Sequence, residues 1–118
     1  MSSPPYVGNA MRDGADTRGW LVGHFRGSED GIRTSPDVEI KWGVHPAGER
    51  RESLVTGDTR TTVRVLVSGR FEIKLNGASH MLRESGDYAM WDPGIDHIWQ
   101  AHEDTVIITV RWPSVATE

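Results

Sequence analysis

Residues 65–99 read VLVSGRFEIKLNGASHMLRESGDYAMWDPGIDHIW, and this stretch decides the fold. Apolar and polar side chains alternate over residues 71–75, which is the period of a half-buried strand. An Asn-Gly pair follows at 76–77, and it is the strongest short-range hairpin signal because both central residues of a type I′ turn need positive φ. Gly-Asp at 86–87 and Asp-Pro-Gly at 92–94 add two more turns. The stretch therefore predicts several short strands joined by tight turns.

Further strands are predicted on both sides of this stretch. Residues 38–44 alternate in the same way, and residues 59–67 are dominated by β-branched side chains. Apolar segments also lie at 20–25, 98–101 and 105–112. Since no segment has a helical repeat, we expect an all-β fold of about ten short strands, an antiparallel β-barrel with negligible helix.

Length and composition favour a single domain. A chain of 118 residues with 36% hydrophobic content can form one core without disulfides or a structural metal. Residues 1–16 are rich in Ser, Pro, Gly and Asp, and they predict a flexible N-terminal arm. The barrel domain is expected over residues 17–118.

Composition also excludes several classes of function. The chain has no cysteine, which excludes thiol catalysis, a cysteine zinc site and a disulfide framework. Its net charge is −4 and its 13 Lys and Arg are scattered, which argues against nucleic acid as a partner. The chain starts without the basic and apolar regions of a signal peptide, and no apolar run is long enough for a membrane helix. We therefore expect a cytoplasmic protein with no nucleic-acid or membrane partner.

The order of turns between residues 65 and 99 resembles the centre of a small single-domain cupin. The second cupin motif is a Gly, five residues, a Pro, four residues and a His. It matches Gly86, Asp92 and His97, with Pro93 one place after the usual proline position. The resemblance implies a jelly-roll barrel, also called a double-stranded β-helix, and it implies a homodimer.

The first cupin motif is degenerate in this chain. The family has two His separated by one residue, then a Glu, then six residues and a Gly. If Gly69 is that glycine, Thr62 stands at the Glu position, and the two His positions fall near Thr56 and Asp58. The resemblance therefore carries over the family's metal site at one residue only, His97.

A metal site needs more ligands than this motif supplies. A divalent ion in such a barrel is held by three or four converging imidazole and carboxylate groups, and a lone imidazole cannot hold it against water. We therefore expect no cofactor. The alternative is a metal-dependent oxygenase, isomerase or epimerase-like enzyme, in which His97, Asp58 and His45 bind a divalent transition metal.

The strand over residues 59–67 has two possible orientations. If Thr62 takes the inward Glu position, then Arg60, Arg64 and Leu66 share its face, because alternate residues of a strand face the same side. A guanidinium inside the barrel is costly to desolvate unless it meets an anion, so Arg64 then predicts an acidic ligand or a nearby carboxylate. In the opposite orientation the valines of this strand form the core face and Arg64 is a solvated surface residue.

Aromatic residues are expected to form the walls of a pocket. His97 and Trp99 share a face by the same alternation, and Tyr88 and Trp91 lie on the preceding strand. Aromatic walls with a few polar groups are typical of a small-molecule site.

The predicted function is a small-molecule-binding barrel for an anionic organic ligand. Arg64 is expected to bind a carboxylate or phosphate next to Thr62, and His97 is the expected hydrogen-bond partner or general acid–base. Such a protein is a metal-independent enzyme or a ligand-sensing module. A structural role, with the barrel filled by side chains, is a third possibility.

Overall fold

The computed structural model describes residues 4–115. Within them the chain forms eight β-strands, one short α-helix and one 3-10 helix. In chain order these elements are α1 (Ala10–Asp13), β1 (Trp20–Val22), η1 (Ser28–Arg33), β2 (Glu39–His45), β3 (Thr61–Ser68), β4 (Phe71–Leu75), β5 (Ala78–Leu82), β6 (Tyr88–Trp91), β7 (His97–Ala101) and β8 (Thr105–Trp112). Residues 1–3 of the predicted arm and 116–118 of the predicted barrel domain lie outside the described residues.

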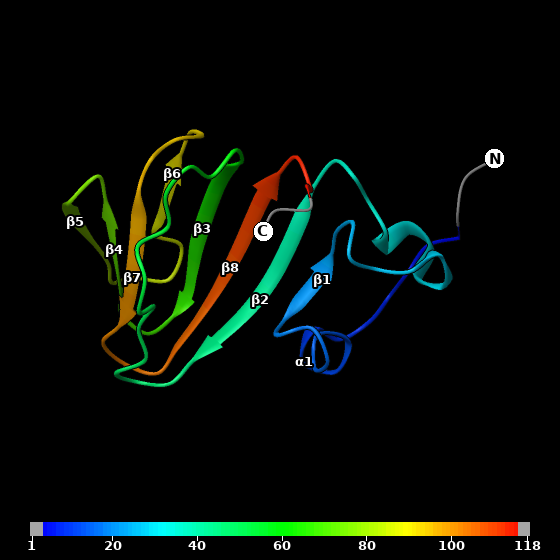
Figure 1. Cartoon of the computed structure of the whole chain (residues 1–118). Helices are drawn as coiled ribbons and strands as arrows, with labels where there is room; N and C mark the ends of the chain where they lie inside the picture. The colour runs from blue at the N-terminus through cyan, green and yellow to red at the C-terminus, as the bar shows by residue number, and fades with distance from the viewer. Residues whose placement is uncertain (1–3, 116–118) are drawn as a thin grey trace.

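The strands form two antiparallel sheets that face each other (Figure 1). The larger sheet has the strand order β1-β2-β8-β3-β6, and the smaller has the order β5-β4-β7. Neighbouring strands such as β2 and β8 are far apart in the sequence, as is typical of a jelly roll. The expected all-β, antiparallel jelly-roll fold is confirmed.

The described residues contain eight strands, fewer than the expected ten or so, although one more segment is extended. Residues 48–55 run along β7, but they pair with it only through isolated antiparallel bridges, Arg50 with Gln100 and Val55 with His97. The N–H of Arg51 donates to the carbonyl of Trp99 at 3.1 Å, which keeps the segment in place. Figure 1 shows it as a thin green trace beside β7. We call residues 48–55 the edge segment.

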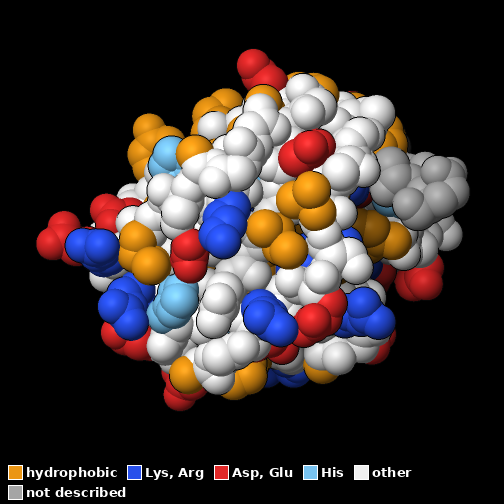
Figure 2. All heavy atoms as spheres, turned by 60° about the vertical axis from the view of Figure 1, so that its left-hand side comes forward, with side chains coloured by type: hydrophobic (Ala, Val, Ile, Leu, Met, Phe, Trp, Pro, Cys, Tyr) orange, Lys and Arg blue, Asp and Glu red, His pale blue; other side chains and the backbone are white. Residues whose placement is uncertain are grey.

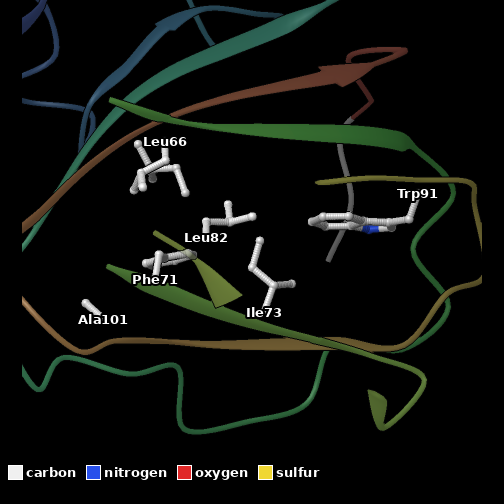
Figure 3. Packing of buried hydrophobic residues seen from close by; sticks show 7 residues of the cluster. Leu66, Phe71, Ile73, Leu82, Trp91 and Ala101 are labelled. Atoms are coloured by element: carbon white, nitrogen blue, oxygen red, sulfur yellow. The ribbon is translucent and has the colours of Figure 1, made fainter. Parts of the chain in front are cut away.

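The core fills the space between the two sheets, as Figure 3 shows. Both sheets contribute apolar side chains that are at least nine-tenths buried: Leu66, Phe71, Ile73, Leu82, Trp91, Ala101 and Ile107. Four of them belong to residues 71–91, the part of the sequence with the clearest alternation and turns. Burial of these side chains is the main driving force for closing one sheet over the other.

Burial settles the orientation of β3. Thr62 and Leu66 are both 1% exposed and face the smaller sheet, whereas Val63 and Val65 are half-buried on the outer face. Arg64 lies between Thr62 and Leu66 on the inward side. The inward orientation of Thr62 is therefore the correct one, and the valines line the outer face of the larger sheet.

The outer surface has no broad region of one charge on the side shown in Figure 2. Basic and acidic side chains lie next to one another there, with apolar side chains between them. On the outer face of the larger sheet, Val44, Tyr88 and Met90 are each more than half exposed. The homodimer implied by the cupin resemblance stays a prediction. None of the helices in residues 4–115 has the length and apolar character that crossing a bilayer requires.

Part of the predicted N-terminal arm lies against the barrel. The side chain of Asn9 caps α1 by accepting hydrogen bonds from the N–H groups of Met11 and Arg12, at 3.0 and 3.2 Å. Gly19 follows, and its carbonyl accepts a hydrogen bond from the N–H of Trp42 in β2 at 2.9 Å. The chain from α1 to β1 is thus held beside β2, where it contributes to the site described below.

Replacing Gly94 with Val is expected to lower the free energy of unfolding by about 1–2 kcal/mol. Gly94 has φ +87°, a conformation that a β-branched residue resists, and no atom crowds the position where a Cβ would stand. Gly94→Asn should lower the free energy of unfolding by less, because Asn tolerates positive φ better than Val does. Urea denaturation of both variants measures the difference. Equal losses for Val and Asn would show that backbone conformation is not the cause.

Candidate ligand site

Two rows of polar and charged side chains cross the inner face of the larger sheet. In one row Glu39 of β2, Arg111 of β8 and Thr62 of β3 are register partners. In the next row Lys41, Thr109 and Arg64 follow in the same order across the three strands. All six are inward positions, since each is two residues from the next along its strand. The barrel interior is therefore strongly charged on this side.

The first of these rows belongs to a closed ion-pair network. Glu39 is 1% exposed and accepts hydrogen bonds from Arg60 Nη1 at 3.1 Å and Ser114 Oγ at 3.0 Å. Arg111 Nη2 lies 2.6 Å from the same carboxylate. Arg60 also donates from Nε to Asp58 Oδ1 at 2.8 Å. Burial would raise the pKa of Asp58, but the hydrogen bonds and charge of Arg60 outweigh it and lower that pKa.

Arg64 is the inward guanidinium without a carboxylate partner. Within residues 4–115, no Asp or Glu oxygen lies within 4.0 Å of its nitrogens, and its buried Nε has no hydrogen-bond partner. The guanidinium carbon is 5.8 Å from the centroid of the Trp91 ring. Burial lowers the pKa of Arg64 to about 10, helped by the charges of Arg111 and Arg51. The interior thus contains a half-buried positive charge that no described carboxylate contacts, although the charge of Asp58 acts on it from a distance.

Other buried polar atoms around Arg64 also lack partners among the described residues. They are the hydroxyl of Thr62, the indole N–H of Trp91 and the Nε–H of Arg111. Thr62 is the register partner of both Trp91 and Arg111, so these atoms come from three adjacent strands. Buried polar groups are normally hydrogen-bonded, and each exception calls for an explanation. A bound polar ligand or ordered water would satisfy them.

His97 lies at the start of β7 and faces the same region. It is 5% exposed, its ring centroid is 5.0 Å from that of Trp91, and Nδ1 is 3.2 Å from the carbonyl of Ile95. The ring of Trp91 therefore packs against His97, and its face also lies next to the guanidinium of Arg64. Burial lowers the pKa of His97, although the Ile95 carbonyl works against it.

A hollow of about 570 Å³ opens beside these residues at the edge of β2. It is lined by α1 and the chain that follows it, by β2, by the edge segment and by Trp99 of β7. Its lining residues are Ala10, Met11, Gly14, Ala15, Arg18, Gly19, Lys41, Trp42, Val44, His45, Glu49, Arg50, Arg51 and Trp99. We call it the edge hollow. Its volume is within the range of small-molecule sites.

Most of the charged side chains that line the edge hollow are cations. Arg18, Lys41, Arg50 and Arg51 all line it, and among the described lining residues only Glu49 has a carboxylate. That carboxylate is hydrogen-bonded to His45 Nδ1. Arg50 pairs with the exposed Glu52 at 3.5 Å, a contact of little energy. The hollow is therefore left with uncompensated positive charge.

His45 packs against two aromatic rings at the wall of the edge hollow. Its ring centroid lies 4.6 Å from that of Trp99 and 5.7 Å from that of Phe71, and its Nδ1 is hydrogen-bonded to the Glu49 carboxylate. Burial lowers the pKa of His45, and the hydrogen bond to Glu49 only partly offsets that effect. The imidazole that lines the hollow is thus His45, whereas His97 and Arg64 lie deeper in the interior and do not line it.

The alternative metal ligands do not come together. Within residues 4–115, no group of three or more His, Asp or Glu side chains is arranged to hold a metal ion. Asp58 is engaged by Arg60, His45 by Glu49, and His97 by the carbonyl of Ile95. Among the described residues, His97, Asp58 and His45 are therefore not brought together as a ligand set.

The predicted aromatic walls lie in different places. Trp91 is 5% exposed and points into the interior, and Trp99 is half-buried and lines the edge hollow. The prediction that Tyr88 is a wall is wrong, because Tyr88 is 66% exposed on the outer face. Strand alternation explains this placement: Trp91 and Ala89 face inward on β6, so Tyr88 faces outward.

Lys41 and the edge-segment cations were not predicted as site residues. The period of two shows that Glu39 and Lys41 share a face opposite to Ile40 and Trp42, but it does not tell which face is inside. In β2 the polar face is the inner one. Arg50 and Arg51 reach the hollow only because the edge segment runs along β7, and no local sequence signal indicates that path.

Lowering the pH from 7 to 5 is expected to reduce the free energy of unfolding by about 1 kcal/mol or more. Burial lowers the pKa of His45 and His97 below the usual 6.5, so the unfolded chain binds protons in this window that the folded chain does not. Stability therefore rises with pH up to about 6.5 and is lost as the pH falls below it. Urea denaturation at several pH values measures the slope. The double variant His45→Gln, His97→Gln should flatten it, and an unchanged slope in that variant would contradict the assignment.

Comparison with solved structures identifies the fold. A cupin protein from Bacteroides fragilis matches with a TM-score of 0.68 and 19% identity over 100% of this chain and 91% of that one. KdgF from Halomonas sp. matches with a TM-score of 0.61 and 22% identity over 67% of this chain and 71% of that one. Salicylate 1,2-dioxygenase from Pseudoaminobacter salicylatoxidans matches with a TM-score of 0.60 and 16% identity over 68% of this chain and 22% of that enzyme.

These likenesses show that the chain has the cupin fold. The resemblance to a small cupin, predicted from Gly86, Asp92 and His97, is confirmed at the level of the fold. No known protein family matches the sequence, and no curated protein does. The function therefore has to be inferred from the residues and the geometry of the candidate site.

Proposed function

We propose that this protein binds a small anionic organic molecule in the edge hollow. The observation that carries the proposal is the set of four cations around a hollow of about 570 Å³ in which the one described lining carboxylate already has a partner. The whole chain has a net charge of −4, so this concentration of positive charge is local. A ligand with one or two acid groups would compensate it.

The lining also favours an organic ligand over a bare inorganic anion. Met11, Trp42 and Trp99 add apolar surface to the hollow, and the indole of Trp99 forms its inner wall with His45. Sites of this kind bind the carbon skeleton by apolar contact and orient it through a few charged groups. Carboxylates and phosphates pair with guanidinium groups through charge-assisted hydrogen bonds.

Arg64 supports the same ligand from behind the hollow. It follows Lys41 in the inward row that crosses β2, β8 and β3, and its charge helps to lower the pKa of Lys41. An anion beside Lys41 therefore lies in the electric field of Arg64. Because the surroundings of Arg64 are desolvated, this attraction is stronger than between surface charges. We infer that Arg64 contributes to affinity without lining the hollow.

The test is a titration with matched pairs of acids and amides. Succinate and benzoate are added to the ¹⁵N-labelled protein, and succinamide and benzamide serve as neutral controls of similar shape. The acids should shift the amide resonances of Lys41, Arg51 and Trp99 in a saturable, salt-sensitive way, and the amides should not. Arg51→Glu should weaken the binding, while Arg83→Glu, at an exposed position away from the hollow, should leave it unchanged. Equal shifts with acids and amides, or none with either, would refute the proposal.

A further inference from the structure

Lys41 is the one lysine of the edge hollow and one of only two in the chain, the other being Lys74. It lies on the inward face of β2, half-buried, with Thr109 of β8 as its register partner. Within residues 4–115, no carboxylate oxygen lies within 4.0 Å of its Nζ. The nearest aromatic ring is that of Trp20, with its centroid 5.5 Å from Nζ. Lys41 thus lines the hollow, and its amine is free of an ion-pair partner among the described residues.

The groups around Lys41 favour its neutral form. Burial lowers the pKa of this amine to about 8, and the charges of Arg64, Arg111 and Arg18 act in the same direction. Glu49 opposes them, but it faces His45 as its hydrogen-bond partner. The neutral amine is a nucleophile, and a lysine desolvated beside other cations is the usual way to obtain one near neutral pH.

We propose that Lys41 forms an imine with a small aldehyde or ketone that has an acid group next to its carbonyl, that is, with a 2-oxo acid. The inference rests on the proposed function, because the same hollow has to bind the acid group. Arg18 and Arg51 line the hollow with Lys41 and lack a carboxylate partner among the described residues, so they are the groups that would hold the acid. The carbonyl carbon would then lie at the amine.

The reaction balances without an oxidant, a reductant or a cofactor. The lone pair of Nζ attacks the carbonyl carbon, a C–N bond forms, and the carbonyl oxygen takes a proton to give a carbinolamine. Loss of the amine proton and of the hydroxyl group, which leaves as water, gives the C=N bond. His45 lines the same hollow, and its neutral form, which the lowered pKa favours, can take the proton that the amine nitrogen loses, while water returns a proton to the leaving hydroxyl.

Reductive trapping tests the proposal. The full-length protein is incubated with glyoxylate or pyruvate at pH 8, and borohydride is added to convert any imine into a stable secondary amine. Intact-mass measurement and peptide mapping then locate the adduct. We expect one adduct per chain at Lys41, at least tenfold more than at Lys74, which is exposed on β4, or at the N-terminal amine. Lys41→Arg should abolish this adduct, and Lys74→Arg should leave it unchanged.

The outcomes separate this inference from the proposed function. If the acids of the titration bind but trapping labels Lys74 as much as Lys41, the imine is refuted and anion binding stands. If the acids do not bind and Lys41 is not labelled, both proposals fail. A melting-temperature comparison shows whether Lys41→Arg is folded. Should it be unfolded, Lys41→Met replaces it, and competition by succinate against glyoxylate labelling of the wild-type protein decides whether the adduct forms in the acid-binding hollow.

Discussion

Replacing Arg60 with Met is expected to lower the free energy of unfolding by about 3–5 kcal/mol, the usual cost of removing one partner from a buried ion pair. Arg60 donates to both Asp58 and Glu39, and Glu39 is 1% exposed. The methionine would leave the Asp58 carboxylate without its main partner and Glu39 with one guanidinium fewer. An uncompensated negative charge would then remain inside the barrel.

The same substitution at Arg64 is expected to raise the free energy of unfolding by about 1–2 kcal/mol, because burying an unpaired charge is costly. Arg64 lies four residues further along the chain and also faces inward, but it has no carboxylate partner among the described residues and its Nε is unsatisfied. Methionine fills a similar volume without a charge. The two variants are thus matched in residue type and differ in pairing.

Urea denaturation of both variants at pH 7 measures this contrast. The two substitutions are expected to change the free energy of unfolding in opposite directions. If Arg64→Met were as destabilising as Arg60→Met, Arg64 would have to be paired in solution, and its role as an uncompensated interior charge would be lost.

Arg64→Met is also expected to weaken the binding of succinate or benzoate by roughly tenfold or more. At an effective dielectric constant near 20, the attraction between two unit charges several ångströms apart is on the order of 2 kcal/mol. This loss of affinity should become only slightly smaller at higher salt concentration, because buried charges are screened less than exposed ones. Stability and affinity are therefore expected to change in opposite directions in one variant.

Isothermal titration or the NMR titration described above measures this affinity. Arg83→Met is the control, since Arg83 is exposed and should change the affinity by less than twofold. An Arg64→Met protein that is folded and binds the acids as the wild type does would show that the field of Arg64 does not reach the hollow.

The position of Arg64 shows how far a strand pattern can be used. Alternation along residues 59–67 places Thr62, Arg64 and Leu66 on one face, and alignment of Thr62 with an inward position of the cupin motif gives the correct side. The pattern does not tell what Arg64 meets inside. The Asp58 carboxylate pairs with Arg60 and not with Arg64, since Arg60 Nε and Asp58 Oδ1 are 2.8 Å apart.

The metal alternative depended on the same kind of long-range information. Asp58, His45 and His97 are residue types that bind metals, but ligand convergence depends on three segments meeting at one point. The sequence alone could not test that, and in the structure each of the three has a different partner. Tyr88 was misplaced because its strand has apolar or aromatic residues on both faces.

Local sequence determined the strands and turns of this protein. The Asn76-Gly77 hairpin has φ values of 49° and 84° at its central residues, as a type I′ turn requires, and β4 pairs with β5 around it. Such turns depend on neighbouring residues only, so they can be predicted from them. Together with the spacing from Gly86 to His97, they were sufficient to indicate the cupin fold.

Only the tertiary structure decided where the edge hollow lies. The edge hollow is formed by α1, β2, the edge segment and β7, which are brought together by pairing between distant parts of the chain. The alternation in β2 is equally compatible with Lys41 inside or outside, and the choice depends on how β2 pairs with β8. A local pattern fixes which side chains share a face, whereas long-range packing determines which face is buried and which charges meet there.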